Sequence, residues 1–162
     1  MVFYPCHDFF INTIRDDSPK ALARIHGNAD NPDLKGSVRF YKTPYEGILV
    51  AAEVYHLPTN APAGSSSFYG FHIHETGDCS DDFAGTGSHY NPFMQTHPFH
   101  AGDMPPLLSY NGYAWMCFYA EQLTIPEIIG KSVVIHDHAD DFTTQPSGNS
   151  GNKIGCGIIH SF

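Results

Sequence analysis

Seven residues that can donate a ligand atom to a metal lie in three short clusters of this chain. They are His72 and His74 in GFHIHETGDC, His89, His97, His100 and Asp103 in GSHYNPFMQTHPFHAGD, and His136 in VVIHDHADD. Imidazole is the commonest protein ligand for copper and zinc, and carboxylate also binds zinc. The sequence therefore predicts two neighbouring metal sites.

The first cluster has the spacing of two ligands on one β-strand. Side chains alternate between the faces of a strand, so His72 and His74 share a face while Ile73 points to the other. The imidazoles would lie about 6–7 Å apart along the backbone and could converge on one metal. The motif is short, and its alternative is an exposed polar strand face with two histidines.

The second cluster is typical of ligands from a loop. His97, His100 and Asp103 fall within seven residues and, with His89, could close around a tetrahedral zinc. The alternative is a histidine-rich surface loop. In the third cluster, His136 ends an apolar run, and Asp140 follows either as a carboxylate that orients a ligating imidazole or as a turn residue.

The remaining histidines are expected to lie outside the sites, including His138, which would share a face with His136 if the strand continued that far. They are His7, His26, His56, His138 and His160. The aromatic residues Trp115, Phe118 and Tyr119 are expected to pack in the core.

Fifteen glycines and twelve prolines favour an all-β architecture with many turns. Runs with strand character are separated by segments rich in Asn, Asp, Pro and Gly, and only PEIIG suggests a helix. Two long irregular stretches, 75–111 and 138–152, carry many of the histidines and glycines, which is typical of functional loops. We expect an N-terminal arm over residues 1–20 and one domain over 21–162. The strand-like runs are 21–27, 36–42, 47–57, 67–75, 112–124, 131–138 and 153–162.

Bulk properties exclude several classes of protein. A formal charge of −9 argues against nucleic-acid binding, and no apolar run is long enough to cross a membrane. The first residues lack the features of a secretory signal, so either the protein stays inside the cell or a leader has been removed. Four cysteines allow two disulfides in three pairings.

Taken together, the motifs resemble those of the copper/zinc superoxide dismutase family, and the Cys79 position resembles its bacterial-type members. GFHIHETGDC, GSHYNP, HAGD, VVIHDHADD and GNSGNKIGCGII occur in the family's order over roughly residues 21–162. The resemblance implies an eight-stranded Greek-key β-barrel or sandwich with two long functional loops. It also implies dismutation of superoxide to dioxygen and hydrogen peroxide, with copper as the redox metal and zinc holding the geometry.

Carried over position by position, the resemblance implies copper ligands, zinc ligands and a disulfide. His89 would bridge both metals and take up a proton during turnover, Asp140 would link a copper histidine to a zinc histidine, and Cys6 and Cys117 would be free thiols. The implied copper ligands are His72, His74, His89 and His136, the zinc ligands are His89, His97, His100 and Asp103, and the disulfide is Cys79–Cys156.

Two departures from the family pattern bear on activity. Lys153 stands where better-known members have an anion-guiding arginine, which keeps the charge but loses the planar fork of donors, so we expect retained but lower activity. Only two residues separate His97 from His100, fewer than in familiar members, which puts zinc binding in question. The loop before Lys153 holds no other Lys or Arg, so electrostatic attraction of superoxide is expected to be weak.

Other functions remain as alternatives. A non-catalytic relative would bind copper and zinc for storage or delivery. A cupin-like barrel also uses an HxH strand, but Asp78 stands at the offset where that family has a glutamate, and residues 97–103 have no place in it. A zinc hydrolase lacks support because no HExxH is present. Family members are commonly dimers and some bacterial ones are monomers, so a homodimer and a monomer both stay open.

Overall fold

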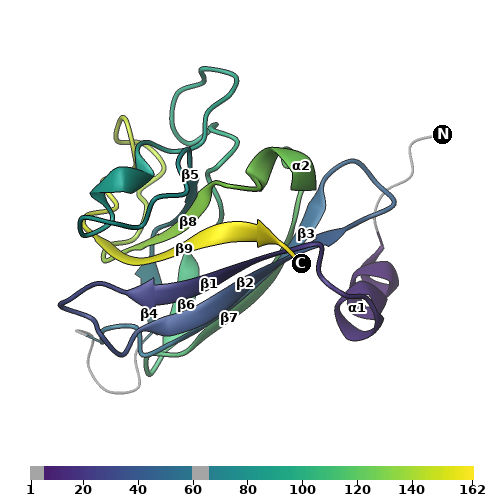
Figure 1. Ribbon diagram of the computed structural model, residues 1–162, viewed down its shortest axis with the longest axis horizontal. Coiled ribbons are helices and arrows are strands. Elements are labelled where there is room, and N and C mark those ends of the chain that lie inside the picture. Colours follow the sequence, from purple (N-terminus) through teal and green to yellow (C-terminus); the bar gives the residue numbers. More distant parts are fainter. Residues whose placement is uncertain (1–5, 60–65) are drawn as a thin grey trace.

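The computed structural model describes residues 6–59 and 66–162, which fold mainly as antiparallel β-structure (Figure 1). The predicted all-β fold class is confirmed. The helices are α1 (His7–Asp16), α2 (Ile125–Ile128) and the short 3₁₀ helix η1 (Ala84–Thr86). The strands are β1 (Ala21–Gly27), β2 (Lys35–Lys42), β3 (Ile48–Tyr55), β4 (Ser66–Tyr69), β5 (Phe71–His74), β6 (Leu107–Tyr110), β7 (Ala114–Ala120), β8 (Ser132–His136) and β9 (Lys153–Ser161).

The strands close into a barrel. Seven pair in the order β5-β8-β9-β1-β2-β3-β7, and β4 pairs with β6. A tight turn joins β6 to β7, and β4 runs into β5, so both sheet edges meet. The chain passes from β3 to β4 and from β7 to β8 without pairing those strands, which is Greek-key connectivity.

One of the seven predicted strand runs is divided into β4 and β5, and β6 lies outside those runs, so the structure has nine strands where the family resemblance implied eight. Gly70 separates β4 from β5; its N–H donates to the His138 carbonyl, and its own carbonyl accepts from the His136 N–H. A Cβ at Gly70 would come within 2.8 Å of the Ser150 Cβ, so this close approach of the two chain segments requires glycine.

Strand β6 was missed by the sequence analysis, which placed it inside an irregular stretch. The signal was present: Asn111-Gly112 follows β6, both residues have positive φ (52° and 79°), and Tyr110 and Tyr113 exchange backbone hydrogen bonds across them. This is the two-residue hairpin turn that Asn-Gly favours.

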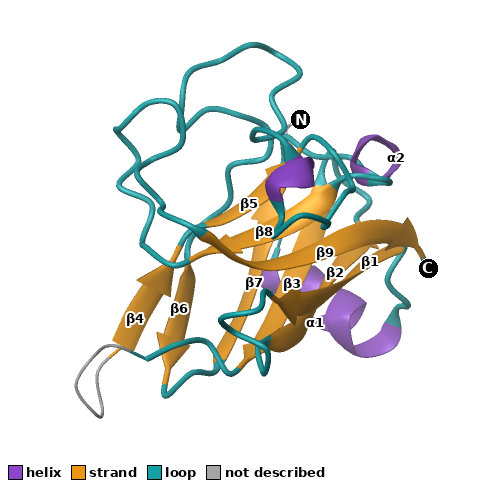
Figure 2. Ribbon diagram, turned by 60° about the vertical axis from the view of Figure 1, so that its left-hand side comes forward, coloured by secondary structure: helices purple, strands orange, loops and turns teal. Residues whose placement is uncertain are grey.

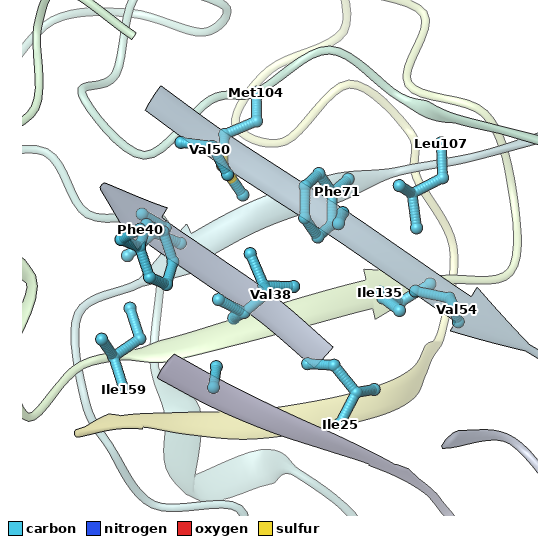
Figure 3. Close-up of a cluster of buried hydrophobic side chains, with 14 of the residues drawn as sticks. Ile25, Val38, Phe40, Val50, Val54, Phe71, Met104, Leu107, Ile135 and Ile159 are labelled. Atoms are coloured by element: carbon cyan, nitrogen blue, oxygen red, sulfur yellow. The ribbon is translucent and has the colours of Figure 1, made fainter. Parts of the chain in front are cut away.

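The barrel interior is filled by inward-facing apolar side chains from all around the barrel (Figure 3). Strand β1 alternates strictly, with Ala21, Ala23 and Ile25 buried, whereas β3 is buried at nearly every position. The reason is that Val50 and Val54 face the interior while Leu49 and Ala51 face α1 on the outside.

Helix α1 lies in the segment that the sequence analysis treated only as an arm, and its helical structure was not predicted. Phe10 and Ile14 of α1 pack with Tyr41 and Leu49 in a small apolar cluster outside the barrel, and Phe10 also stacks on Tyr119 at 5.4 Å between ring centroids. Helix α1 therefore covers part of the outer face of the sheet, and the long loops gather on another side, beyond β5 and β8 (Figure 2). Within the described residues, no helix has the length and apolarity to span a membrane.

Candidate metal centre

Two adjacent strands present histidines on their outer face. Phe71 and Ile73 of β5 belong to the barrel core, so His72 and His74 point outward, as the alternation predicted. Strand β8 pairs with β5, and at its end a shift of register follows Ile135, where His136 lies. All three imidazoles are buried, because the loops cover this face.

The loop between β5 and β6 brings its ligands to the edge of β5 that does not pair with β8. Tyr90 N–H donates to the Ile73 carbonyl and Ile73 N–H donates to the Gly102 carbonyl, both at 2.8 Å. These bonds place His89 beside His74 and Asp103 beside His72. Backbone hydrogen bonding thus positions ligands that are distant in sequence.

The predicted copper set converges. One ligand atom from each of its four histidines lies within 4.8 Å of the others, and the Nε2 atoms of His74 and His136 are 3.3 Å apart. The opposite nitrogens are held by the protein: His74 Nδ1–H donates to the Gly87 carbonyl at 2.9 Å, and His136 Nδ1 lies 3.4 Å from the Gly151 carbonyl. The Nε2 atoms are consequently the ones that face the centre.

The predicted zinc set also converges, despite the short spacer between His97 and His100. Its ligand atoms lie within 4.8 Å of one another. His89 Nδ1 is 2.7 Å from Asp103 Oδ1 and 3.4 Å from His100 Nδ1. His97 Nδ1 is 3.1 Å from Asp103 Oδ2, but its geometry is not that of a hydrogen bond. A ring of donors around a common point is the arrangement that a tetrahedral zinc site requires.

Asp140 connects the two sets. Its Oδ2 accepts from His72 Nε2–H at 2.7 Å, and its Oδ1 accepts from His97 Nε2–H at 2.8 Å and from the Phe142 N–H. Each imidazole is left with Nδ1 for a metal. Gly148 allows this contact, because at its φ of +69° a Cβ would lie only 2.0 Å from Asp140 Oδ1.

The ionisation states suit metal binding. Burial lowers the pKa of His72, that of His74 to about 2 and that of His136 to about 3, which keeps these imidazoles neutral. Burial raises the pKa of Asp140, but hydrogen bonds from His72, Phe142 and His97 outweigh it and bring the pKa to about 2. Burial also raises the pKa of Asp103, but the hydrogen bond from His89 and the electrostatic interactions with His89, His100 and His97 together outweigh it, so the pKa is lowered.

Three buried ring nitrogens test whether copper and zinc fit these residues. His72 Nδ1, His89 Nε2 and His97 Nδ1 are buried and have no hydrogen-bond partner among the residues that the structure describes. A buried polar atom without a partner is costly. His72 belongs to the copper set, His97 to the zinc set and His89 to both; His89 Nδ1 lies beside Asp103 and His100 of the zinc set, which leaves its Nε2 for the copper set. Neutral imidazoles with one carboxylate are ligands that suit copper and zinc, so the residues fit both metals.

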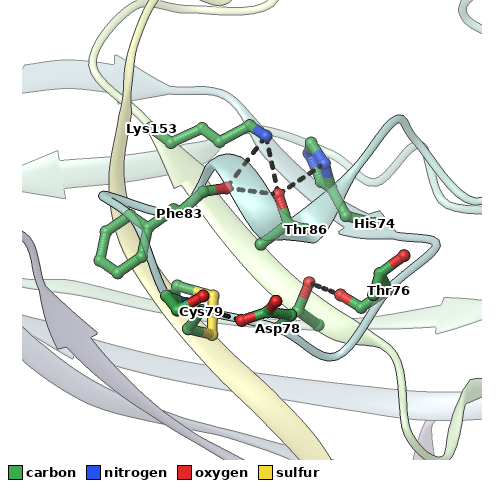
Figure 4. Close-up of a disulfide and its surroundings, with 10 residues drawn as sticks. His74, Thr76, Asp78, Cys79, Phe83, Thr86 and Lys153 are labelled. Atoms are coloured by element: carbon green, nitrogen blue, oxygen red, sulfur yellow. Dashed lines mark hydrogen bonds between the residues drawn. A yellow bond between two sulfur atoms is a disulfide. The ribbon is translucent and has the colours of Figure 1, made fainter.

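A cavity of about 610 Å³ opens onto the centre and gives a small molecule access. Its walls include His74, His89, His136 and Lys153. The Lys153 ammonium donates to Thr86 Oγ1 at 2.7 Å and to the Phe83 carbonyl at 3.2 Å (Figure 4). It also donates to the Gly87 carbonyl at 3.3 Å. Burial lowers the pKa of Lys153.

A disulfide fixes the loop that holds Lys153. Cys79 is bonded to Cys156 of β9, as the resemblance implied, and Phe83 packs on this bridge with Val134 (Figure 4). Cys6 is a free, exposed thiol. Cys117 is free and partly covered beside α1. The bridge ties β9, which carries Lys153, to the loop whose oxygens accept its hydrogen bonds.

All the predicted ligand residues come together, and the five histidines expected elsewhere are absent from both sets. The expectation of core packing was wrong for Trp115 and Tyr119. Trp115 is 56% exposed on the outer face of the barrel, and Tyr119 stacks on Phe10 of α1 outside it. Two residues beside the centre were missed. Thr86 contacts Lys153, and Gln145 joins the two loops by accepting from the His97 N–H and donating to the His97 carbonyl. No local sequence pattern marks either one.

Comparison with known proteins agrees with this geometry. The family model for copper/zinc superoxide dismutase (SODC) matches residues 34–159. The superoxide dismutase [Cu-Zn] of Legionella pneumophila is 33% identical over 145 residues, which cover 85% of each chain. The superoxide dismutase-like protein YojM of Bacillus subtilis is 36% identical over 120 residues, covering 64% of this chain and 61% of YojM.

Solved structures show the same likeness. A point mutant of a SOD-like protein from Bacillus subtilis superposes with a TM-score of 0.73 at 28% identity, covering 86% of this chain and 97% of that one. The clock protein EA4 superposes with a TM-score of 0.72 at 27% identity, covering 89% and 96%. From its motifs, its fold and these matches, the chain belongs to the copper/zinc superoxide dismutase family.

Proposed function

We propose that this protein catalyses the dismutation of superoxide at a copper ion that shares His89 with a zinc ion. The observation that carries the proposal is the pair of histidine sets with one common member. Each set holds buried ring nitrogens that lack a hydrogen-bond partner in the described part of the chain. His72, His74, His89 and His136 would hold copper, and His89, His97, His100 and Asp103 would hold zinc.

Copper supplies a one-electron redox couple, whereas zinc has no redox change and serves to hold geometry. Two superoxide anions and two protons yield one dioxygen and one hydrogen peroxide, so the protein must admit an anion and deliver protons. His89 can hold a proton at Nε2, the nitrogen that faces the copper set. The neutral state of His74 and His136 leaves the Nε2 atom of each ring available as a ligand.

Lys153 would attract the anion to the cavity. Among the residues that line the cavity, Lys153 is the single Lys or Arg, and the formal charge of the whole chain is −9. Its ammonium donates to three loop oxygens. Lys153 would therefore attract the anion as a fixed point charge and would not orient it through several hydrogen bonds, as an arginine could. We expect a lower rate than an arginine at this position would give.

A second candidate is metal storage or delivery without turnover. The matches include proteins described as SOD-like as well as superoxide dismutases. In addition, the Lys153 ammonium donates to three loop oxygens, and this feature favours a non-catalytic site. The two functions predict the same metals and differ only in turnover.

The test is superoxide disappearance in two samples of the same protein, one loaded with copper and zinc and the other with zinc at both sites. The enzyme predicts rapid decay with the copper-loaded sample alone, and a salt-dependent loss of rate in Lys153→Ala. A copper-loaded sample that is no faster than the zinc control would establish the storage function. An unchanged rate and salt dependence in Lys153→Ala would remove Lys153 from the proposal.

A further inference from the structure

Lys153 lies between two cavities, one lined by histidines and the other by aspartates. One is the histidine-lined cavity over the metal centre. The other, of about 570 Å³, is lined by Asp30, Asp82 and Asp137, and Lys153 forms part of its wall as well. Lysine has a flexible stem and a compact charge. Carboxylates on the far side would attract the ammonium away from the metal centre, so something must hold it in place.

Thr86 provides the shortest contact of that ammonium. Its hydroxyl oxygen is 2.7 Å from Lys153 Nζ, whereas the Phe83 carbonyl is at 3.2 Å (Figure 4). The Gly87 carbonyl is at 3.3 Å. The Thr86 side chain is fully buried. It does not line the cavity and reaches it through two neighbours: the Lys153 ammonium at 2.7 Å and, more distantly, His74 Nδ1 at 3.4 Å.

The Thr86 hydroxyl is itself oriented by its surroundings. It donates to the Phe83 carbonyl at 2.9 Å, which leaves an oxygen lone pair for the Lys153 ammonium. The disulfide to β9 and the packing of Phe83 on it fix this segment of the loop. The acceptor is thus rigid and dry, a setting in which a charge-assisted hydrogen bond is strong.

We propose that Thr86 is a positioning residue that holds the Lys153 ammonium on the metal side of the wall between the two cavities, so that the charge acts on an anion entering the histidine-lined cavity. The inference rests on the proposed function in that it names what directs the attracting charge. Since arginine at position 153 would bring more donors and a stiffer head group, the lysine depends on this hydroxyl more than an arginine would.

The first test needs no metal and no turnover. Lysine amines of the metal-free protein are acetylated with a limiting active ester, and the rate at Lys153 is measured by mass spectrometry, with exposed Lys35 as the internal reference. Thr86→Val should raise the relative rate at Lys153 about threefold to tenfold by releasing the ammonium. Thr86→Ser, which keeps the hydroxyl, should leave it near wild type. Equal rates in wild type and Thr86→Val would overturn the proposal.

The second test asks whether the position of the charge matters for an anion. Azide is titrated against the protein loaded with Cu(II) and zinc, and its Kd is read from the visible spectrum. Thr86→Val should weaken azide binding about threefold to tenfold, and Lys153→Met by at least as much. In the Lys153→Met background, Thr86→Val should have no further effect, because the two side chains act as a unit.

The outcomes separate this inference from the enzymatic proposal. An equal effect of Thr86→Val with and without Lys153 would show a general loosening of the loop and overturn the positioning role. Coupled effects on azide without superoxide turnover would keep the positioning role and refute the enzyme. Metal content and thermal unfolding of each variant show whether Thr86→Val still folds; if it does not, Thr86→Ala, which also removes the hydroxyl, takes its place in both tests with the same expected effects.

Discussion

Replacement of Asp140 by asparagine should weaken copper binding more than zinc binding. The carboxylate accepts from both His72 and His97, whereas an amide has only one oxygen. At Oδ1 the donors are His97 Nε2–H and the Phe142 N–H; at Oδ2 there is only His72 Nε2–H. The amide oxygen should therefore take the place of Oδ1, which turns the NH₂ group toward His72.

The consequence falls on the nitrogen that would bind copper. With an amide N–H facing Nε2, the His72 ring must accept there and carry its proton on Nδ1, the atom that points into the copper set. Removal of a carboxylate that orients a ligating histidine typically costs about 10- to 100-fold in metal affinity. This corresponds to about 1.4–2.8 kcal/mol. We expect a loss in this range for copper and a smaller loss for zinc, whose histidine keeps its acceptor.

The assay is competition with chromogenic chelators, run separately for Cu(II) and Zn(II), on wild type and Asp140→Asn. Asp141→Asn is the matched control, since it removes the same charge from the adjacent residue, whose exposed carboxylate accepts from Thr143 and Thr144. Its affinities for both metals should stay near wild type. Unchanged copper affinity in Asp140→Asn, or a larger loss for zinc than for copper, would refute the reasoning.

Three further predictions concern the loops and the outer face. Gly148→Ala should lower zinc affinity more than tenfold in the same assay, because its Cβ meets the bridging carboxylate; Gly130→Ala, at a φ of +80° with nothing within 4 Å of its Cβ, should leave zinc binding unchanged. Phe10→Ala should lower the free energy of unfolding by about 1–3 kcal/mol in urea, since this ring is partly buried, whereas Ile11→Ala, 55% exposed, should change it by less than about 0.5 kcal/mol. Burial raises the pKa of Cys117 to about 11, so its thiol is almost wholly protonated at pH 8 and should react with iodoacetamide far more slowly than in urea; equal rates would contradict its burial.

The ligand pattern could be predicted from the sequence where it depends on local geometry. His72 and His74 share a face because strand side chains alternate, and the core position of Ile73 follows from the same period. The family resemblance supplied His89 as the shared member and the Cys79–Cys156 pairing, which spacing alone left open. The geometry brings all of these residues together.

The parts that could not be predicted depend on contacts between distant segments. Gln145 binds the backbone of His97 across 48 positions, and Lys153 binds Thr86 across 67. Neither side chain has a local pattern that would single it out. Spacing likewise could not decide whether Asp140 was a turn residue or a bridge, since its two imidazole partners come from a strand and from the other loop.

Two elements escaped prediction for different reasons. Helix α1 was missed because its apolar residues form a short stripe that gains its stability from packing on the sheet, and an isolated helix of this length is marginal. Strand β6 was not predicted although the dipeptide Asn111-Gly112 indicates a hairpin turn. An Asn-Gly turn is stronger evidence for a hairpin than the lack of a clear apolar run in β6 is against one.

The positions of the two metals would decide whether copper and zinc share His89. Crystals of the protein loaded with copper and zinc would be measured with X-rays on either side of each metal's absorption edge, so that the two ions are distinguished by element. We expect copper among His72, His74, His89 and His136, zinc among His89, His97, His100 and Asp103, and His89 in contact with both. A single metal position, or two positions that do not share His89, would contradict it.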